Sequence, residues 1–215
     1  MEDILVYISG EDPVTKTIIE RILTYCSPRF KVFKEMPARG GQIKHKISEL
    51  NRLSSSKPVI LLTDLDVTQC PPMLKNSLLA NQEQNEDFIL NIAVDEAEAW
   101  LMADREGFAE YFGIPISEIP NAVPQKMGGR KPLTEMEFPY KSSWMLTHVL
   151  ISKSSKDELK RQIEAQGTAA KGKEYNPAVV PFIKNDWNIE NAMQNSDSLK
   201  RMVIRLQTLK DKYSS

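Results

Sequence analysis

The sequence predicts an α/β protein with a mostly parallel sheet flanked by helices and a helical C-terminal half. Two observations lead to this fold class. Short apolar runs of strand length alternate with segments of helical periodicity as far as about residue 104, which is typical of right-handed β-α-β units. Beyond that point helical periodicity prevails. We therefore expect an α/β core over residues 1–104 and a mainly helical region, packed on that core, over residues 105–215.

Four strands are expected in the core. Residues 4–9 and 88–94 are strongly apolar, whereas residues 30–35 are more polar and are expected at an edge of the sheet. The central strand lies in residues 58–66, where a continuous apolar run is typical of a strand buried on both faces.

Helical spacing of apolar residues marks the connecting segments. Residues 14–26 form an amphipathic helix, with Asp12 before Pro13 as a suitable N-cap. Helices are also expected over residues 43–53 and just before the fourth strand, and Ser196 is expected to cap a last helix. Residues 125–132 are interpreted as a basic loop containing glycine. The other helical segments expected in the second half are residues 106–112, 116–119, 144–151, 156–165, 176–182 and 189–193.

The composition limits the class of protein. Of 215 residues, 41% are hydrophobic and 27% charged, as in an ordinary globular chain, and the net charge of -1 provides no overall basic field to attract nucleic acid. No apolar run approaches the length of a membrane span, and the start of the chain is acidic, unlike a signal peptide. Two cysteines and two histidines exclude a His-rich zinc site and favour a cytoplasmic protein with reduced thiols.

The central strand runs into Asp64 and Asp66. Residues two apart in a strand share a side, so both carboxylates are expected at one point beyond the carboxyl end of the strand. That edge is where ligands bind in open α/β sheets. Two adjacent carboxylates repel unless a cation or a proton lies between them, and Mg²⁺ or Mn²⁺ suits oxygen ligands. The structural alternative is that Asp64 ends the strand and Asp66 stands in a turn, with neither binding a metal.

Other strand ends carry further acids. Glu11 follows the first strand, and Glu96 and Glu98 follow the fourth. On a helix, residues two apart diverge by about 200°, so only one of Glu96 and Glu98 is expected to face the Asp pair unless the chain is extended there. The alternative is ordinary enrichment of acids near helix N-termini.

Basic residues are concentrated in loops. They are expected to contact nucleic-acid phosphates, and the alternative is a solvated surface. These residues are Arg39, Lys126, Arg130, Lys131, Lys171 and Lys173.

The first half of the chain resembles a Toprim domain, the catalytic core of topoisomerases, primases and OLD-type nucleases. That superfamily has a Glu after the first strand and an Asp-x-Asp after a central strand, which correspond here to Glu11, Asp64 and Asp66. One departure is that the family order is Glu followed by Gly, whereas here Ser9 precedes Gly10 and Glu11 follows it. This order puts the acid or base in doubt.

Three further motifs are similar to small bacterial Toprim-related proteins of unknown function, relatives of the RloB-like group. They are the Glu-Ala-Glu-Ala-Trp-Leu-Met-Ala-Asp run at residues 96–104, Tyr-Asn-Pro at residues 175–177, and Ser-Asp-Ser-Leu at residues 196–199. The motifs that carry the resemblance are thus spread over most of the chain.

The resemblance implies metal-dependent action on a phosphodiester of DNA or RNA, in a defence or mobile-element system that includes a partner protein. Asp64 and Asp66 would hold Mg²⁺ or Mn²⁺, and Glu11 would move a proton or complete the site. Glu96 or Glu98 would hold a second ion.

Two other functions stay open. The first is a non-catalytic Toprim-like binding module, which the late position of Glu11 favours. The second is a phosphatase of the haloacid-dehalogenase type, because residues 64–68 match the first motif of that class. Against the phosphatase, the motif normally lies on the first strand of its domain.

Overall fold

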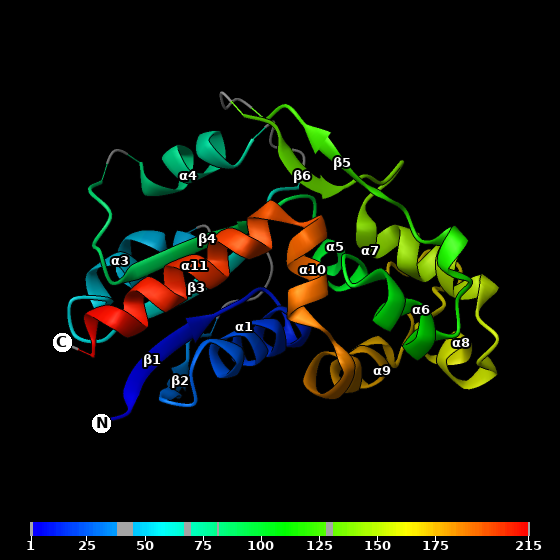
Figure 1. The fold of residues 1–215 in the computed structure, drawn as a ribbon, viewed down its shortest axis with the longest axis horizontal. Helices are drawn as coiled ribbons and strands as arrows, with labels where there is room; N and C mark the ends of the chain where they lie inside the picture. Colours follow the sequence, from blue (N-terminus) through cyan, green and yellow to red (C-terminus); the bar gives the residue numbers. More distant parts are fainter. Residues whose placement is uncertain (1, 38–44, 67–69, 81, 128–130, 215) are drawn as a thin grey trace.

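The computed structural model contains a four-stranded, fully parallel sheet (Figure 1). The order of the strands is β2-β1-β3-β4, so β1 and β3 lie in the middle. The strands are β1 (Ile4–Ser9), β2 (Phe30–Glu35), β3 (Val59–Asp64) and β4 (Phe88–Ala93). The structure describes residues 2–37, 45–66, 70–80, 82–127 and 131–214. The predicted α/β class is confirmed.

Burial explains the order of the strands. In β2 only Phe30 is buried, which agrees with the predicted edge position. In β3 every residue except Asp64 is buried, and β4 is buried throughout. Continuous apolar sequence is the pattern of a strand covered on both faces.

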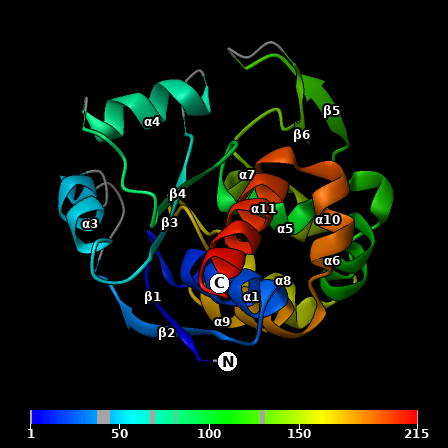
Figure 2. The same ribbon diagram turned by 60° about the vertical axis from the view of Figure 1, so that its left-hand side comes forward.

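Helices cover both faces of this sheet. The helix α1 (Pro13–Cys26) lies on one face, and α3 (Ile47–Leu53) and α4 (Pro71–Leu79) lie on the other (Figure 2). The predicted N-cap of α1 is confirmed, because Asp12 accepts a hydrogen bond of 2.8 Å from the Thr15 backbone N–H.

The second half is mainly helical. Its helices are α5 (Ala97–Met102), α6 (Arg105–Phe112), η1 (Ile116–Glu118), α7 (Ser142–Trp144), η2 (Met145–Leu150), η3 (Ile151–Lys153), α8 (Asp157–Ile163), α9 (Tyr175–Pro181), η4 (Phe182–Asp186), α10 (Ile189–Asn195) and α11 (Asp197–Lys212). The predicted cap of the last helix is confirmed, because Ser196 accepts a hydrogen bond from the Leu199 backbone N–H.

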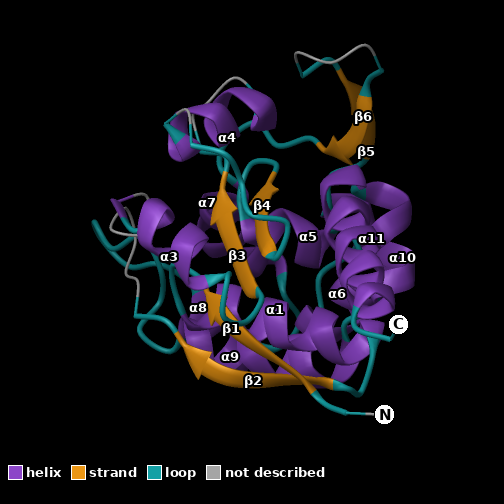
Figure 3. Cartoon of the chain, turned by 90° about the vertical axis from the view of Figure 1, so that its left-hand side faces the viewer, coloured by secondary structure: helices purple, strands orange, loops and turns teal. Residues whose placement is uncertain are grey.

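The sequence reading missed an antiparallel hairpin in this half. Its strands, β5 (Ala122–Gln125) and β6 (Leu133–Met136), flank the predicted basic loop and project from one end of the molecule (Figure 3). Each strand has four residues, and β5 contains Pro124. A run this short, interrupted by proline, has too few alternations to be distinguished from a loop.

Both halves share one hydrophobic core. A single cluster joins apolar residues of β1, α1 and β3 to those of α5, α9 and α11. The helix α11 lies against both β4 and α1 (Figure 1). The chain ends also approach each other, since the Arg29 guanidinium donates hydrogen bonds of 2.9 Å to both the Glu2 carbonyl and the Tyr213 carbonyl (Figure 3). No helix in the described part of the chain is long and apolar enough to cross a membrane.

Candidate active site

Four carboxylates come together at the carboxyl edge of the sheet. Glu11 follows β1, Asp64 ends β3, and Glu96 and Glu98 follow β4. These three strands are neighbours and run parallel, so their carboxyl ends meet at one edge. Burial raises the pKa of Asp64, and the charges of Glu98, Glu11 and Glu96 raise it further. The structure therefore places these four predicted residues together.

Asp64 is the centre of this group. Its Oδ1 accepts a hydrogen bond of 2.9 Å from the Ala97 backbone N–H, which fixes the carboxylate at the start of α5. Burial, followed by the charges of Glu98, Glu11 and Glu96, raises the pKa of Asp64 to about 9. The hydrogen bond from Ala97 opposes this rise only in part. Without a cation, Asp64 thus holds its proton at neutral pH.

Glu11 reaches the site although it stands after Gly10. The hydroxyl of Thr63, a fully buried residue of β3, donates a hydrogen bond of 2.7 Å to Glu11 Oε1. This contact holds Glu11 beside the end of β3. Ser9, the last residue of β1, has a buried hydroxyl with no hydrogen-bond partner among the described residues.

Both Glu96 and Glu98 act on Asp64, whereas helical geometry led us to expect only one unless the chain was extended. The chain is extended at this point. Glu96 precedes α5 as its N-cap, with φ -137° and ψ 168°, so the angular separation of helical residues does not apply to this pair. The two side chains are 10% and 5% exposed, respectively.

Asp66 lies at the same edge for a different reason from the one expected. It stands beyond the end of β3 with φ 53°, a left-handed conformation, so the alternation of side chains along a strand does not place it beside Asp64. Its Oδ1 lies 2.8 Å from Nζ of Lys141, and the same ammonium lies 3.4 Å from Oε1 of Glu96. Lys141 thus links Asp66 to the carboxylates after β4.

A second lysine enters the group from the helical half. Nζ of Lys171 lies 2.7 Å from Oε1 of Glu98 and 3.5 Å from Oδ2 of Asp12. The Tyr175 hydroxyl donates a further hydrogen bond of 2.8 Å to Glu98 Oε1. Burial alone would lower the pKa of Lys171, but the charges of Glu98 and Asp12 outweigh it and raise the pKa. Lys171 was predicted to contact a nucleic-acid phosphate. In the structure its ammonium group is already paired with the carboxylates of Glu98 and Asp12.

The remaining basic candidates lie elsewhere. Lys126 and Lys131 are exposed at the two ends of the hairpin loop, and Lys173 is exposed before α9. Arg39 and Arg130 lie outside the described residues.

Sequence reasoning missed three residues of this site. No sequence pattern indicated that Lys141 belongs to the site, because it lies more than seventy residues after its partner Asp66. Tyr175 belonged to a noted motif but had no assigned role. Asp95, with φ 65°, accepts a hydrogen bond of 3.0 Å from the Ser142 backbone N–H. Burial, followed by the charge of Glu96, raises the pKa of Asp95 to about 6.

The chemistry of these side chains fits a hard divalent cation. Asp64, Glu11 and Glu96 supply only carboxylate oxygens, and burial, followed by the neighbouring carboxylates, raises the pKa of Asp64. In the described part of the chain, no group of three or more acidic, His or Cys side chains is already arranged around a metal position. Two lysine ammonium groups instead bind carboxylates of the group. Binding a metal ion therefore requires rotation of carboxylates away from these lysines.

A comparison with family models identifies the family. The model described as "Domain of unknown function (DUF4276)" matches residues 10–207. The chain belongs to the DUF4276 family. The DUF4276 match includes all four central carboxylates and both lysines, so the site described above lies within the family's domain. Searches of curated proteins and of solved structures found no match to the chain.

Proposed function

We propose that this protein is a Mg²⁺- or Mn²⁺-dependent, Toprim-related enzyme that acts on a phosphodiester of DNA or RNA. One observation carries the proposal. Asp64 lies among three further carboxylates from neighbouring strand ends, and its pKa is raised to about 9. Such a concentration of like charge is stabilised by a bound cation. Clusters of strongly perturbed acids at a sheet edge are also typical of functional sites.

The residues divide into distinct roles. Asp64, Glu11 and Glu96 would hold the ion, which neutralises charge on the phosphoryl oxygens and orients the attacking water. Glu11, which the Thr63 hydroxyl holds, would accept a proton from that water. The exposed Lys126, Lys131 and Lys173 would contact phosphates farther along the nucleic acid. This substrate agrees with the cytoplasmic location expected from the sequence.

One observation favours a second candidate, a non-catalytic binding module. Lys141 and Lys171 already neutralise part of the acidic group from within the chain. If these ion pairs persist in solution, the lysines take the place of metal ions and the edge is structural. The haloacid-dehalogenase-type phosphatase stays a prediction with no further support from the contacts of Asp66.

The test compares wild-type protein with Asp64→Asn. Melting is measured with and without millimolar Mg²⁺ and Mn²⁺, because a ligand that binds only the native state raises its stability. Cleavage of DNA and RNA is followed in parallel with hydrolysis of an aryl phosphate. We expect metal-dependent stabilisation and nucleic-acid cleavage by the wild-type protein, and loss of both in Asp64→Asn.

A matched control is Asp3→Asn. Asp3 is exposed and lies before β1, at the opposite end of the sheet from the acidic group. This variant should behave as the wild-type protein. Melting that is indifferent to both ions, together with intact DNA and RNA, would leave the binding module as the better description. Hydrolysis of the aryl phosphate alone would favour the phosphatase.

A further inference from the structure

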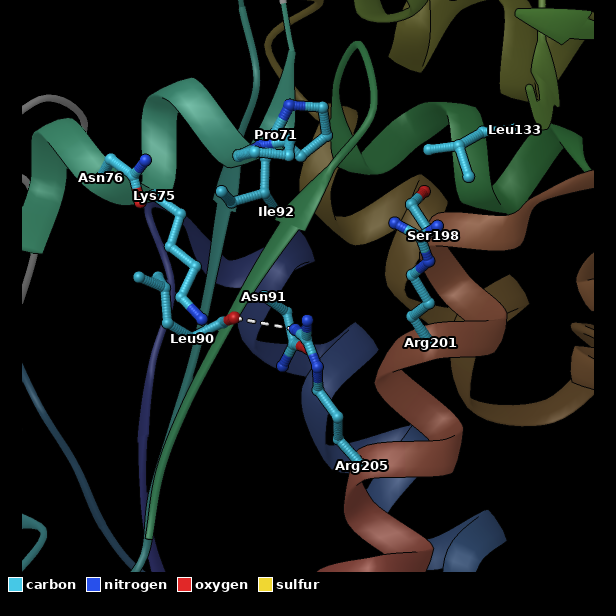
Figure 4. Close-up of a pocket in the computed structure, with 11 residues that line it drawn as sticks. Pro71, Lys75, Asn76, Leu90, Asn91, Ile92, Leu133, Ser198, Arg201 and Arg205 are labelled. Atoms are coloured by element: carbon cyan, nitrogen blue, oxygen red, sulfur yellow. Dashed lines mark hydrogen bonds between the residues drawn. The ribbon is translucent and has the colours of Figure 1, made fainter. Parts of the chain in front are cut away.

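A pocket lies along the open edge of β4, away from the acidic group. It has a volume of about 200 Å³ and is enclosed by α4 on one side and α11 on the other, with Leu133 of β6 at one end (Figure 4). Its backbone wall is formed by Leu90, Asn91 and Ile92. The pocket shares no lining residue with the carboxylate group at the carboxyl edge.

Three cationic side chains line this pocket. Lys75 comes from α4, and Arg201 and Arg205 come from α11, one turn apart. None of them takes part in an ion pair within the part of the chain that the structure describes. Burial, followed by the charge of Arg205, lowers the pKa of Lys75, and burial followed by the charge of Arg201 lowers that of Arg205. The pocket thus concentrates positive charge, and its lining residues include no carboxylate.

Arg205 and Asn91 are fixed at the back of the pocket. Nη1 of Arg205 donates hydrogen bonds of 3.0 Å to the Leu90 carbonyl and 3.1 Å to Asn91 Oδ1 (Figure 4). Because the side-chain oxygen of Asn91 accepts this hydrogen bond, the N–H₂ group of the same amide points away from Arg205 Nη1. Asn91 is 2% exposed, and its Nδ2 has no hydrogen-bond partner among the described residues. A buried donor without an acceptor is unusual in a native protein.

We propose that this pocket binds a small phosphate monoester, with the phosphate group between Lys75 and Arg201. Phosphate supplies both the negative charge and the acceptor oxygens that these side chains lack. The organic part of the ester would lie against the apolar wall of Pro71, Ile92 and Leu133. The volume is below the roughly 300–1,000 Å³ of pockets for drug-sized ligands, which favours a compact ester.

The test measures binding of two probes by calorimetry at constant ionic strength. Inorganic phosphate tests the charged group, and glycerol 3-phosphate tests the charged group with a small organic part. We expect saturable binding of both, with the ester tighter. Lys75→Gln and Arg201→Gln should each weaken binding about tenfold or more, as expected for loss of a charge-assisted hydrogen bond. The side chains of these two residues make no hydrogen bond within the described part of the chain, so folding should be little affected.

The matched control is Lys200→Gln, which removes the same charge from an exposed position of α11 outside the pocket. It should bind both probes as the wild-type protein does. Asp64→Asn should also retain binding, which separates this inference from the function proposed for the acidic edge. The proposal is overturned if the wild-type protein binds neither probe at millimolar concentration. It is equally overturned if Lys200→Gln weakens binding as much as the pocket variants, because the attraction would then be non-specific. An ester that binds no tighter than inorganic phosphate would remove the role of the apolar wall and with it the assignment to a monoester.

Discussion

Nζ of Lys171 lies 2.7 Å from Oε1 of Glu98, which joins the polar segment before α9 to the first turn of α5. Ion pairs on open surfaces contribute little to stability. This pair differs because the Glu98 side chain is only 5% exposed and its Oε1 also accepts a hydrogen bond from the Tyr175 hydroxyl. The lysine therefore compensates a carboxylate that water does not reach freely.

Replacing Lys171 by Met should destabilise the protein. The substitution leaves Glu98 buried without its cation, and breaking a buried pair in this way costs about 3–5 kcal/mol. Because the Lys171 side chain is 32% exposed, we expect the lower part of that range. Urea unfolding at neutral pH measures the loss, with Lys173→Met as an exposed control on the same segment.

Adding Glu98→Gln to Lys171→Met should recover part of the lost stability. Glutamine removes the uncompensated charge and keeps an oxygen for the Tyr175 hydroxyl. A double-mutant cycle measures the coupling between the two sites. Strictly additive effects would show that the ion pair is energetically unimportant.

Asp64→Asn should be more stable than the wild-type protein, and the difference should depend on pH. The folded-state pKa of Asp64, about 9, lies above its unfolded value, so the native state holds the proton more tightly. Stability due to this group is present below about pH 4 and falls as pH rises toward 9. Asparagine does not titrate. The free energy of unfolding of the variant should therefore equal that of the wild-type protein at about pH 4. At about pH 8 it should be larger by about 1 kcal/mol or more.

Urea unfolding of both proteins across this pH range checks the prediction. Taking the difference between them cancels the titration of all other groups that the substitution leaves unchanged. A difference that stays constant from acid to alkaline pH would mean that Asp64 is not held in its protonated form.

Lys141→Gln should increase the affinity of the site for Mn²⁺. The ammonium of Lys141 competes for the carboxylates of Asp66 and Glu96, and it is partly exposed. Removing a competing cation of this kind should strengthen metal binding about three- to tenfold, which corresponds to a screened ion pair of about 1 kcal/mol. Calorimetric titration with Mn²⁺ measures the change. Lys153→Gln, which removes a lysine paired with the distant Glu118, should leave the affinity unchanged.

The affinity for Mn²⁺ should also rise with pH up to about 9, because the ion must displace the proton of Asp64. Asp64→Asn, which we expect to lose metal binding, should show no rise of this kind. A wild-type affinity that does not change across this range would show that Asp64 is not a ligand.

Ser198→Ala should destabilise the junction between α5, β6 and α11. The Ser198 hydroxyl accepts a hydrogen bond of 2.8 Å from Nε1 of Trp100 and donates one of 3.0 Å to Glu135. Trp100 is fully buried, so its indole N–H would lose its acceptor at a cost of about 1–3 kcal/mol. Urea unfolding followed by tryptophan fluorescence measures the loss. Ser152→Ala, a substitution outside this junction, should have little effect, and equal losses in the two variants would contradict the prediction.

Much of the fold follows from local sequence. Three of the parallel strands were predictable because each is a compact apolar run, as in β3 before Asp64, and the more polar β2 was expected at an edge of the sheet. The capping residues Asp12 and Ser196 were also recognisable, because a cap depends on groups within three residues. The hairpin of β5 and β6 was not predictable, since its stability comes from contacts with distant elements such as α11.

The candidate site was predictable only in part. Strand ends supplied Glu11, Asp64, Glu96 and Glu98, because parallel strands bring their ends together. The placement of Asp66 depends on its left-handed backbone, which no periodicity reveals. The role of Lys141 could be predicted only by knowing which distant segment folds over the carboxyl edge of the sheet.

The position of α11 has a consequence for the order in which the molecule forms during synthesis. This helix covers β4 and α1, yet it follows every other described element in the chain. While the ribosome is still translating the preceding segments, the apolar core that Leu199 and Leu206 of this helix complete lacks their contribution. The nascent chain therefore carries an exposed, aggregation-prone surface until translation of α11 is complete. Removal of this helix should accordingly leave an insoluble polypeptide instead of a smaller folded core.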